Sequence, residues 1–229
     1  MKRIAIIPAR SGSKGLKNKN ILPICDKPML AYSVEAAVKS GLFERVILST
    51  DSEEYGAIAQ AYGAEVILRG ERVSNDSAST FMVLEDLFQR IELDFDYFML
   101  LQPTSPMRNE QHIREACALF EERIAEYDFL ASIQKAHHPA VLVRPVEADF
   151  SLKHFDIDYS SYRRQAFCDY SPNGAIYIAK PQRYLEQKHF YGKSSLGYEM
   201  NDIDSADVDN AVDYELVCIL MHKRLNGEL

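Results

Sequence analysis

Short apolar runs alternate along this chain with longer segments whose apolar residues recur at helical spacing. The short runs are rich in Val, Ile, Leu and Tyr, and they cover residues 4–7, 46–49, 65–68, 97–101, 130–133 and 175–179. Continuous apolar runs of this length are typical of strands covered on both faces. Helical spacing follows at residues 29–40, 52–62, 79–91, 110–122 and 207–225. The alternation predicts an α/β fold with a mostly parallel, doubly wound sheet.

The last predicted helix is amphipathic. One apolar stripe along it is formed by Val208, Ala211, Val212, Leu216, Ile219 and Leu220. A stripe of this kind marks the face of a helix that packs on the core. We therefore expect this helix to pack on the sheet.

A single domain spanning residues 1–229 is expected, because the chain is 47% hydrophobic and long enough to bury one sizeable core. Residues 135–172 interrupt the alternation with aromatic residues and scattered charges. Long insertions in compact domains are usually functional. We interpret this segment as a hairpin excursion or a subunit-contact arm, that is, a small insertion for dimerisation and for the sugar site, with a plain surface loop as the alternative.

The net charge of the chain and its distribution indicate which kinds of ligand the protein can bind. The net charge of −8 argues against a nucleic-acid partner. The 25 residues before Asp26 nevertheless carry six basic side chains and no acidic one, which favours a small anionic ligand. No apolar run is long enough to span a membrane, and the opening apolar run is too short for a signal peptide. A cytoplasmic protein with four scattered, reduced cysteines is expected.

The strongest local signal is the glycine-rich basic loop that directly follows the first predicted strand, with the sequence PARSGSKGLKNKN at residues 8–20. Open α/β sheets bind their ligands at this position. Gly12 and Gly15 allow a tight turn, while Arg10, Lys14 and Lys19 could neutralise phosphate charge. Neither a P-loop nor a G-x-G-x-x-G motif is present, which argues against ATPase and dehydrogenase functions.

Two carboxylates suggest a metal site near the end of the chain. Asp202 and Asp204 would point the same way on an extended segment, and such oxygen ligands suit Mg²⁺. The alternative is that they cap the last helix. The adjacent His137 and His138 would face opposite ways on a strand and lack a completing ligand, so no metal is assigned to them.

Five segments carry a resemblance to a known family. They are PARSGSKGLKNKN at 8–20, Leu68-Arg69 with SNDSAST at 74–80, LLQPTSPMR at 100–108, PNGAIY at 172–177, and DID at 202–204. Taken together and in this order, they resemble the motifs of the acylneuraminate cytidylyltransferases, the CMP-sialic acid synthetases. The family fold, a Rossmann-like nucleotidyltransferase sheet, agrees with the predicted order of elements.

The resemblance implies a role for individual residues. CTP would be bound by Arg10, Ser11, Gly12, Ser13, Lys14, Gly15, Lys19, Asn20, Arg69, Asn75, Ser77 and Thr80. The sugar would be bound by Gln102, Thr104, Ser105, Asn173 and Arg164, with Arg163 as the alternative to Arg164 for the sugar carboxylate. Mg²⁺ would be held by Asp202 and Asp204. The catalytic groups would be Arg10, Lys14, Lys19 and Asp204.

The implied reaction is an attack by the anomeric hydroxyl of a sialic-acid-like sugar on the α-phosphorus of CTP, which gives a CMP-sugar and pyrophosphate. N-acetylneuraminate or legionaminate is the expected acceptor. The alternatives are pseudaminate, an eight-carbon ulosonate, or a nucleotide-binding relative without catalysis. The resemblance also implies a homodimer, and no general base is identified.

Overall fold

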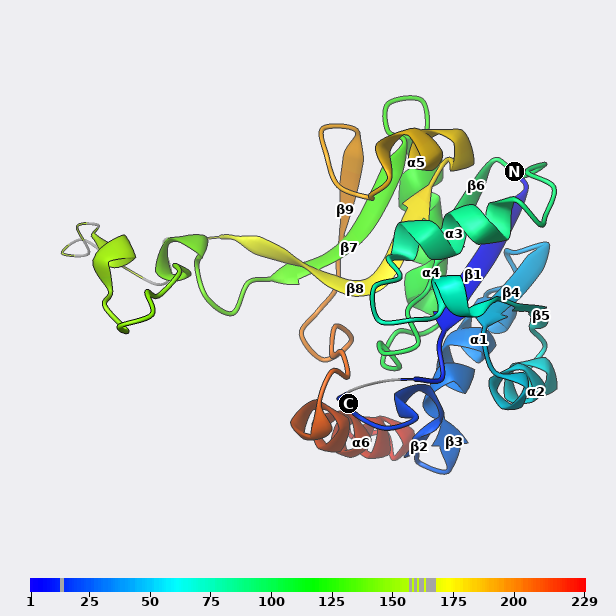
Figure 1. Cartoon of the computed structure of the whole chain (residues 1–229), viewed down its shortest axis with the longest axis horizontal. Coiled ribbons are helices and arrows are strands. Elements are labelled where there is room, and N and C mark those ends of the chain that lie inside the picture. The colour runs from blue at the N-terminus through cyan, green and yellow to red at the C-terminus, as the bar shows by residue number, and fades with distance from the viewer. Residues whose placement is uncertain (13–14, 157, 159, 161–162, 164–167) are drawn as a thin grey trace.

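Seven strands form one twisted sheet in the order β5-β4-β1-β6-β8-β7-β9 (Figure 1). The computed structural model describes residues 1–12, 15–156, 158, 160, 163 and 168–229. The sheet strands are β1 (Arg3–Ala9), β4 (Arg45–Thr50), β5 (Glu65–Leu68), β6 (Tyr97–Leu100), β7 (Phe129–Lys135), β8 (Tyr170–Ala179) and β9 (Ser195–Glu199). Only β8 runs antiparallel to its neighbours within this sheet. The predicted α/β class with a mostly parallel sheet is confirmed.

The helices are α1 (Met29–Ser40), α2 (Glu53–Ala61), α3 (Thr80–Phe88), α4 (Glu110–Glu122), α5 (Pro181–Gln187) and α6 (Ala211–Leu225). The bounds of α1 and α4 match the prediction. Gly41 ends α1 with φ of 68°, a conformation that glycine adopts without strain. Ser52 and Ser79 cap α2 and α3, because each side chain accepts a hydrogen bond from a backbone N–H in the first turn.

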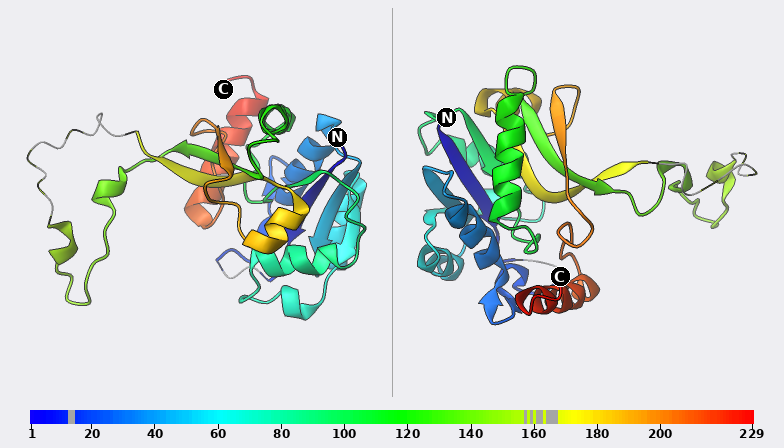
Figure 2. Two further views of the ribbon diagram at one scale, coloured as in Figure 1. Left: turned by 90° about the horizontal axis from the view of Figure 1, so that it is seen from above. Right: turned by 180° about the vertical axis from the view of Figure 1, so that it is seen from behind.

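The helices cover both faces of the sheet (Figure 2). Side chains alternate along β1, so that Ala5 and Ile7 join the core under α1, α2 and α4. Ile4 and Ile6 point to the opposite core under α3 and α5. Two buried layers of apolar side chains thus fix the sheet, and the carboxyl ends of the parallel strands meet at one edge.

The last helix departs from the prediction. In α6, Val217 and Met221 are buried, whereas Val212, Leu216 and Ile219 are 76%, 50% and 56% exposed. The buried side packs on the small hairpin of β2 (Pro23–Ile24) and β3 (Lys27–Pro28) and on the start of α1. The prediction that α6 packs on the sheet is therefore wrong. The helix is apolar on more than one side, so periodicity alone could not select the face that is buried.

The described residues between 136 and 169 form an arm between β7 and β8, which extends far beyond the other elements in Figure 1. Within its described part, only two short 3-10 helices occur, Ala140–Leu142 and Lys153–Phe155. At its base, β7 and β8 pair up to Lys135 and Tyr170, and the Ala136 N–H donates to the Asp169 carbonyl at 2.8 Å. The break in the predicted pattern therefore coincides with this arm.

The edge strand β9, the short helix α5 and the β2–β3 hairpin were not predicted. In β9 only Tyr198 is buried, so the strand lacks the apolar run used to find the others. A Cβ at Gly197 would lie 2.7 Å from Ile133 Cδ1, so a side chain there would disturb the pairing with β7. Among the described residues, no helix combines the length and the apolar character needed to cross a membrane.

Candidate active site

A cavity of about 540 Å³ opens at the carboxyl ends of the parallel strands, beside the glycine-rich loop. Its walls come from the loops after β1, β5 and β6, from the start of α3 and from the segment before α6. The lining residues are Pro8, Arg10, Gly15, Lys19, Asn20, Arg69, Ala78, Thr80, Val83, Gln102, Pro103, Thr104, Asp207 and Asp209. The structure therefore brings together residues that lie as far apart in the chain as Pro8 and Asp209.

The glycine-rich loop is held by hydrogen bonds at both ends. At its start, the Ser11 N–H and hydroxyl donate to the Asp51 carboxylate at 2.8 and 3.0 Å. At its end, the buried Asn20 amide donates to the Arg10 carbonyl at 3.0 Å. These contacts turn Ser11 toward the end of β4 and leave Arg10 and Lys19 as the described cations of this loop that line the cavity.

Two glycines of the loop differ in their surroundings. A Cβ at Gly15 would lie 3.1 Å from the carbonyl oxygen of Asp209, so the loop and the segment before α6 approach closely. A Cβ at Gly12 would meet nothing within 4 Å. The predicted ligands Ser13 and Lys14 lie outside the described residues.

Arg69 supplies a buried donor to the cavity. It follows β5 directly, and its side chain is fixed by a hydrogen bond from Nε to the Ser74 hydroxyl at 3.2 Å. Its Nη1 is buried and has no hydrogen-bond partner. Burial lowers the pKa of Arg69, partly offset by the charge of Asp51. A buried donor without a partner is costly unless a ligand satisfies it, so Arg69 fits an acceptor atom in the cavity.

Of the three predicted residues in the next loop, only Thr80 lines the cavity. The Asn75 side-chain oxygen accepts hydrogen bonds from the N–H and hydroxyl of Ser77 at 3.0 and 2.6 Å. Asn75 also donates to the Glu71 carbonyl at 3.3 Å. In this structure, Asn75 and Ser77 stabilise the turn that leads into α3.

The expected geometry of Asp202 and Asp204 is wrong. Residues 202–205 form a turn rather than an extended segment, and the Ser205 N–H donates to the Asn201 carbonyl at 3.0 Å. Asp204 is 8% exposed and is bonded to Arg224, to Asn201 and to His112. Neither carboxylate lines the cavity that holds Arg10 and Lys19. In the structure, Asp204 connects α4 to α6.

A second acidic pair, Asp207 and Asp209, lies at the position facing the basic loop where Asp202 and Asp204 were expected. Both line the cavity, and Lys19 Nζ lies 3.1 Å from Asp209 Oδ1. The Val208 N–H donates to the Thr104 carbonyl at 2.8 Å, and the Ser105 hydroxyl donates to Asp207 at 3.3 Å. Burial raises the pKa of Asp207, and the nearby negative charge of Asp209 raises it further. The sequence contains a signal for this pair, because D-V-D at 207–209 repeats the spacing of D-I-D at 202–204.

The cavity continues into an aromatic pocket of about 460 Å³, with which it shares Thr80 and Gln102. The walls of this pocket include Phe81, Leu100, Tyr177, Tyr184, Lys188, His189, Phe190 and Tyr191. Apolar walls with a few polar groups are typical of sites for small molecules. Apart from Thr80 and Gln102, the sequence analysis assigned no role to the residues that line this pocket.

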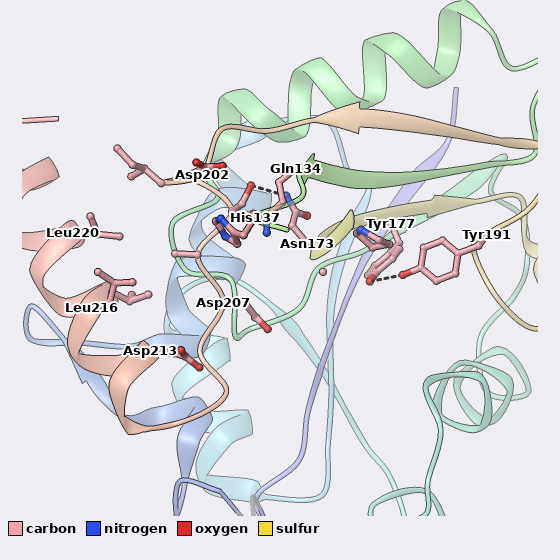
Figure 3. Close-up of a pocket in the computed structure, with 16 residues that line it drawn as sticks. Gln134, His137, Asn173, Tyr177, Tyr191, Asp202, Asp207, Asp213, Leu216 and Leu220 are labelled. Atoms are coloured by element: carbon pink, nitrogen blue, oxygen red, sulfur yellow. Dashed lines mark hydrogen bonds between the residues drawn. The ribbon is translucent and has the colours of Figure 1, made fainter. Parts of the chain in front are cut away.

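A groove of about 610 Å³ adjoins both spaces and lies between the base of the arm and α6 (Figure 3). Figure 3 shows the hydrogen bond of 3.1 Å between the Tyr177 and Tyr191 hydroxyls, at the point where the groove meets the aromatic pocket. Asp207 is shared with the first cavity.

The predicted sugar ligands are distributed over these spaces. Gln102 and Thr104 line the first cavity, and Asn173 lines the groove. Ser105 is fully buried and lines none of the three spaces. Arg164 lies outside the described residues, and Arg163 is exposed.

Chemically, the first cavity joins a cationic wall to two carboxylates. Arg10, Lys19 and Arg69 can bind an anion with an acceptor-bearing ring, such as a nucleotide. Two carboxylates with room for phosphate oxygens and water match the ligands that Mg²⁺ prefers. No larger cluster of His, Cys, Asp and Glu suited to a metal occurs in the part of the chain that is described.

The fold and this cavity define an α/β protein with a candidate anion site at the carboxyl edge of its parallel strands. Residues 4–215 match the cytidylyltransferase family. The chain belongs to this family.

Relatives agree with this assignment. The N-acylneuraminate cytidylyltransferase of Escherichia coli is 48% identical over 223 residues, which are 97% of this chain and 53% of that protein. This chain thus spans about half the length of that relative. CMP-N,N'-diacetyllegionaminic acid synthase of Legionella pneumophila is 32% identical and covers 100% of this chain and 99% of its own length.

Solved structures share the fold. A CMP:2-keto-3-deoxy-manno-octonic acid synthetase complexed with CTP has a TM-score of 0.71 at 19% identity, and the match covers 98% of this chain and 100% of that one. At this identity, the similarity concerns the fold alone.

Proposed function

We propose that this chain transfers CMP from CTP to the anomeric hydroxyl of a sialic-acid-like nonulosonate and releases pyrophosphate. The observation that carries the proposal is the cavity in which Arg10, Lys19 and Arg69 face Asp207 and Asp209, next to an aromatic pocket. The cavity suits a charged nucleotide, and the pocket is a suitable site for the second substrate.

In this proposal the side chains bind and orient rather than form covalent bonds. The anomeric oxygen forms a bond to the α-phosphorus while the bond to the pyrophosphate oxygen breaks, and the hydroxyl proton is released to water. Arg10 and Lys19 would stabilise the negative charge of the phosphates, and Arg69 would donate to the cytosine or ribose. Positioning and charge stabilisation carry most of the catalysis in reactions of this class.

The proposal includes Mg²⁺ as cofactor, held by Asp207 and Asp209 in place of the Asp202 and Asp204 expected from the sequence. When bound, Mg²⁺ would neutralise phosphate charge. The fit rests on the position of Asp207 and Asp209, which line the same cavity. A cation there would offset the burial and the neighbouring negative charge that raise the pKa of Asp207. Lys19, which pairs with Asp209, would then move its contact to a phosphate oxygen.

N-acetylneuraminate or legionaminate is the proposed acceptor. The support is the 48% identity to the Escherichia coli N-acylneuraminate cytidylyltransferase and the full-length match to the Legionella pneumophila legionaminic acid synthase. A pseudaminic acid cytidylyltransferase of Campylobacter jejuni is 29% identical, so pseudaminate is the second candidate. The product would serve the assembly of surface glycans.

The proposal also includes a homodimer that forms through the arm. Val143, Phe150 and Leu152 on the described part of the arm are 64%, 85% and 61% exposed, and Leu216 and Ile219 of α6 are also exposed. Large apolar side chains exposed on an extended arm and on a helix favour a protein interface. The expected cytoplasmic location stays a prediction.

The test is pyrophosphate release from CTP and Mg²⁺ with N-acetylneuraminate, legionaminate, pseudaminate or 3-deoxy-manno-octulosonate, each offered separately. Release with one of the first two sugars supports the proposal. Release only with pseudaminate or the octulosonate would correct the acceptor. CTP binding without turnover of any of the four sugars would favour the non-catalytic nucleotide-binding alternative.

A further inference from the structure

Arg108 is an unusual residue of the interior, because its charged side chain is 1% exposed and belongs to the largest fully buried side chains of the protein. No Asp or Glu in the described part of the chain forms an ion pair with it. Burying an arginine without a carboxylate is expensive, and packing alone does not require it at this position. Its surroundings therefore point to a specific role.

The guanidinium of Arg108 joins three elements. Nη2 donates to the Ser33 hydroxyl of α1 at 2.6 Å and to the Gln102 carbonyl, after β6, at 3.4 Å. Nε donates to the Ala175 carbonyl of β8 at 3.4 Å. Nη1 is buried without a partner. Planar, forked donors of this kind hold several acceptors in fixed relative positions.

Three donors converge on the main-chain carbonyl of Gln102. They are the Ser105 N–H at 3.3 Å, the Ser33 hydroxyl at 3.2 Å and Nη2 of Arg108 at 3.4 Å. The peptide group that carries the Gln102 side chain is therefore fixed from α1, from its own loop and from Arg108.

Arg108 also acts on the surface against which the Gln102 side chain packs. A Cβ at Gly174 would lie 2.8 Å from Gln102 Oε1, so this oxygen lies directly on the Gly174 backbone. Gly174 immediately precedes Ala175, whose carbonyl accepts from Arg108. The same guanidinium thus holds both the backbone of Gln102 and its contact surface on β8.

Gln102 lies at a decisive place in the site. It lines both the nucleotide cavity and the aromatic pocket, so its amide is at the junction where a second substrate would meet the α-phosphate. We infer that Arg108 is a positioning residue, which sets the orientation of Gln102 and through it the position of the acceptor. This inference rests on the proposed function, since it requires two substrates that meet at this junction.

A double-mutant cycle tests the inference. Arg108→Met removes every donor at similar volume, and we expect kcat/KM for the acceptor to fall roughly 30-fold, because a small misplacement of a substrate has large effects on rate. The dissociation constant for CTP should stay within about 3-fold, since no side chain of the cationic wall contacts Arg108. Arg108→Lys keeps the charge and one donor nitrogen, and it should recover part of the loss.

The decisive comparison is with Gln102→Ala. If Arg108 acts through Gln102, the double variant Arg108→Met with Gln102→Ala loses no more kcat/KM than Gln102→Ala alone. Losses that multiply, or an equal loss of CTP binding in Arg108→Met, would overturn the inference. Phe88→Leu, at the opposite end of α3 from the site, is the control for reduced stability, and its kcat/KM should match the wild type.

Ser33→Ala keeps the inference testable should Arg108→Met fail to fold. It removes one of the three donors to the Gln102 carbonyl, and kcat/KM for the acceptor should fall about 3-fold with CTP binding unchanged. Unchanged kcat/KM in Ser33→Ala would then count against the inference. A wild-type protein without turnover of any sugar would instead contradict the proposed function, so the two failures are distinguishable.

Discussion

Lys19 Nζ lies 3.1 Å from Asp209 Oδ1, so the basic loop after β1 and the acidic segment before α6 are in direct contact across the first cavity. The two residues are 190 positions apart in the chain. This ion pair therefore places a cation of the glycine-rich loop next to a candidate metal ligand.

Single substitutions should show that Asp207 and Asp209, rather than Asp202 and Asp204, act with Mg²⁺. Asp207→Ala and Asp209→Ala should each lower kcat roughly 100-fold and raise the Mg²⁺ concentration needed for half-maximal rate, because each removes a proposed ligand of the metal. Initial rates over a Mg²⁺ titration measure this. Asp202→Ala, whose carboxylate lies outside this cavity, should keep the Mg²⁺ dependence of the wild type; the reverse pattern would restore the original assignment.

Arg69 should determine nucleotide affinity. Arg69→Met removes the buried donor Nη1, and we expect the dissociation constant for CTP to rise about 10-fold, as for the loss of a hydrogen bond from a charged group. Calorimetric titration of CTP measures the effect. Arg72→Met is the matched control, because this arginine is exposed and does not line the cavity. Equal losses in both variants would mean that only the overall charge matters.

Asp204 should contribute to stability rather than to metal binding. Burial raises its pKa, but the hydrogen bond from His112 and the charges of His112 and Arg224 outweigh it, so the pKa is lowered to about 2. Since the pKa of Asp204 is lower in the folded than in the unfolded state, the ionised group stabilises the fold above about pH 4. This stabilisation is lost as the pH falls toward the folded-state pKa.

Asp204→Asn should therefore reduce the free energy of unfolding by about 2 kcal/mol at pH 7, and the difference from the wild type should shrink by pH 3. Denaturant unfolding at the two pH values measures it. Asp202→Asn, which is exposed, should leave the free energy of unfolding unchanged at both. A difference that is the same at pH 7 and pH 3 would contradict the role of the charge.

Two features of the structure favour glycine at position 174, namely its backbone conformation and the close approach of the Gln102 side chain. Its φ is 80°, and Gln102 Oε1 occupies the space of a Cβ. Gly174→Ala should lower stability by about 1–2 kcal/mol and displace Gln102, which raises KM for the acceptor. Gly70→Ala is the control, since φ is −78° and a Cβ there meets nothing within 4 Å. Thermal unfolding and acceptor KM, measured on both variants, would show no difference if the prediction is wrong.

The arm should decide the oligomeric state. Replacing residues 136–169 with a short turn is structurally feasible, because Lys135 and Tyr170 are already paired at its base. We expect the wild type to be a dimer and the shortened variant a folded monomer, as measured by light scattering after size-exclusion chromatography. A shortened variant that is still dimeric would contradict this prediction and would favour the exposed apolar side of α6 as the dimer interface.

The sequence by itself determined the sheet class, six of the strands, the bounds of α1 and α4, and the loop that contributes Arg10 and Lys19. These features depend on local signals, namely apolar runs, helical spacing and glycines at turns, which need no information on the partner elements. The edge strand β9 escaped because an edge strand buries few side chains and so carries a weak pattern.

Only the tertiary structure decided which acidic pair faces the basic loop and which side of α6 is buried. The D-x-D spacing occurs twice within eight residues, and spacing cannot show that one pair forms a turn closed by Arg224 while the other is bonded to the loop after β6. In the same way, Arg108 follows a proline-rich turn in the sequence, and only the packing of α1, β6 and β8 around it makes it a buried charge behind Gln102. Such long-range contacts depend on how elements are placed in space, which a local pattern does not specify.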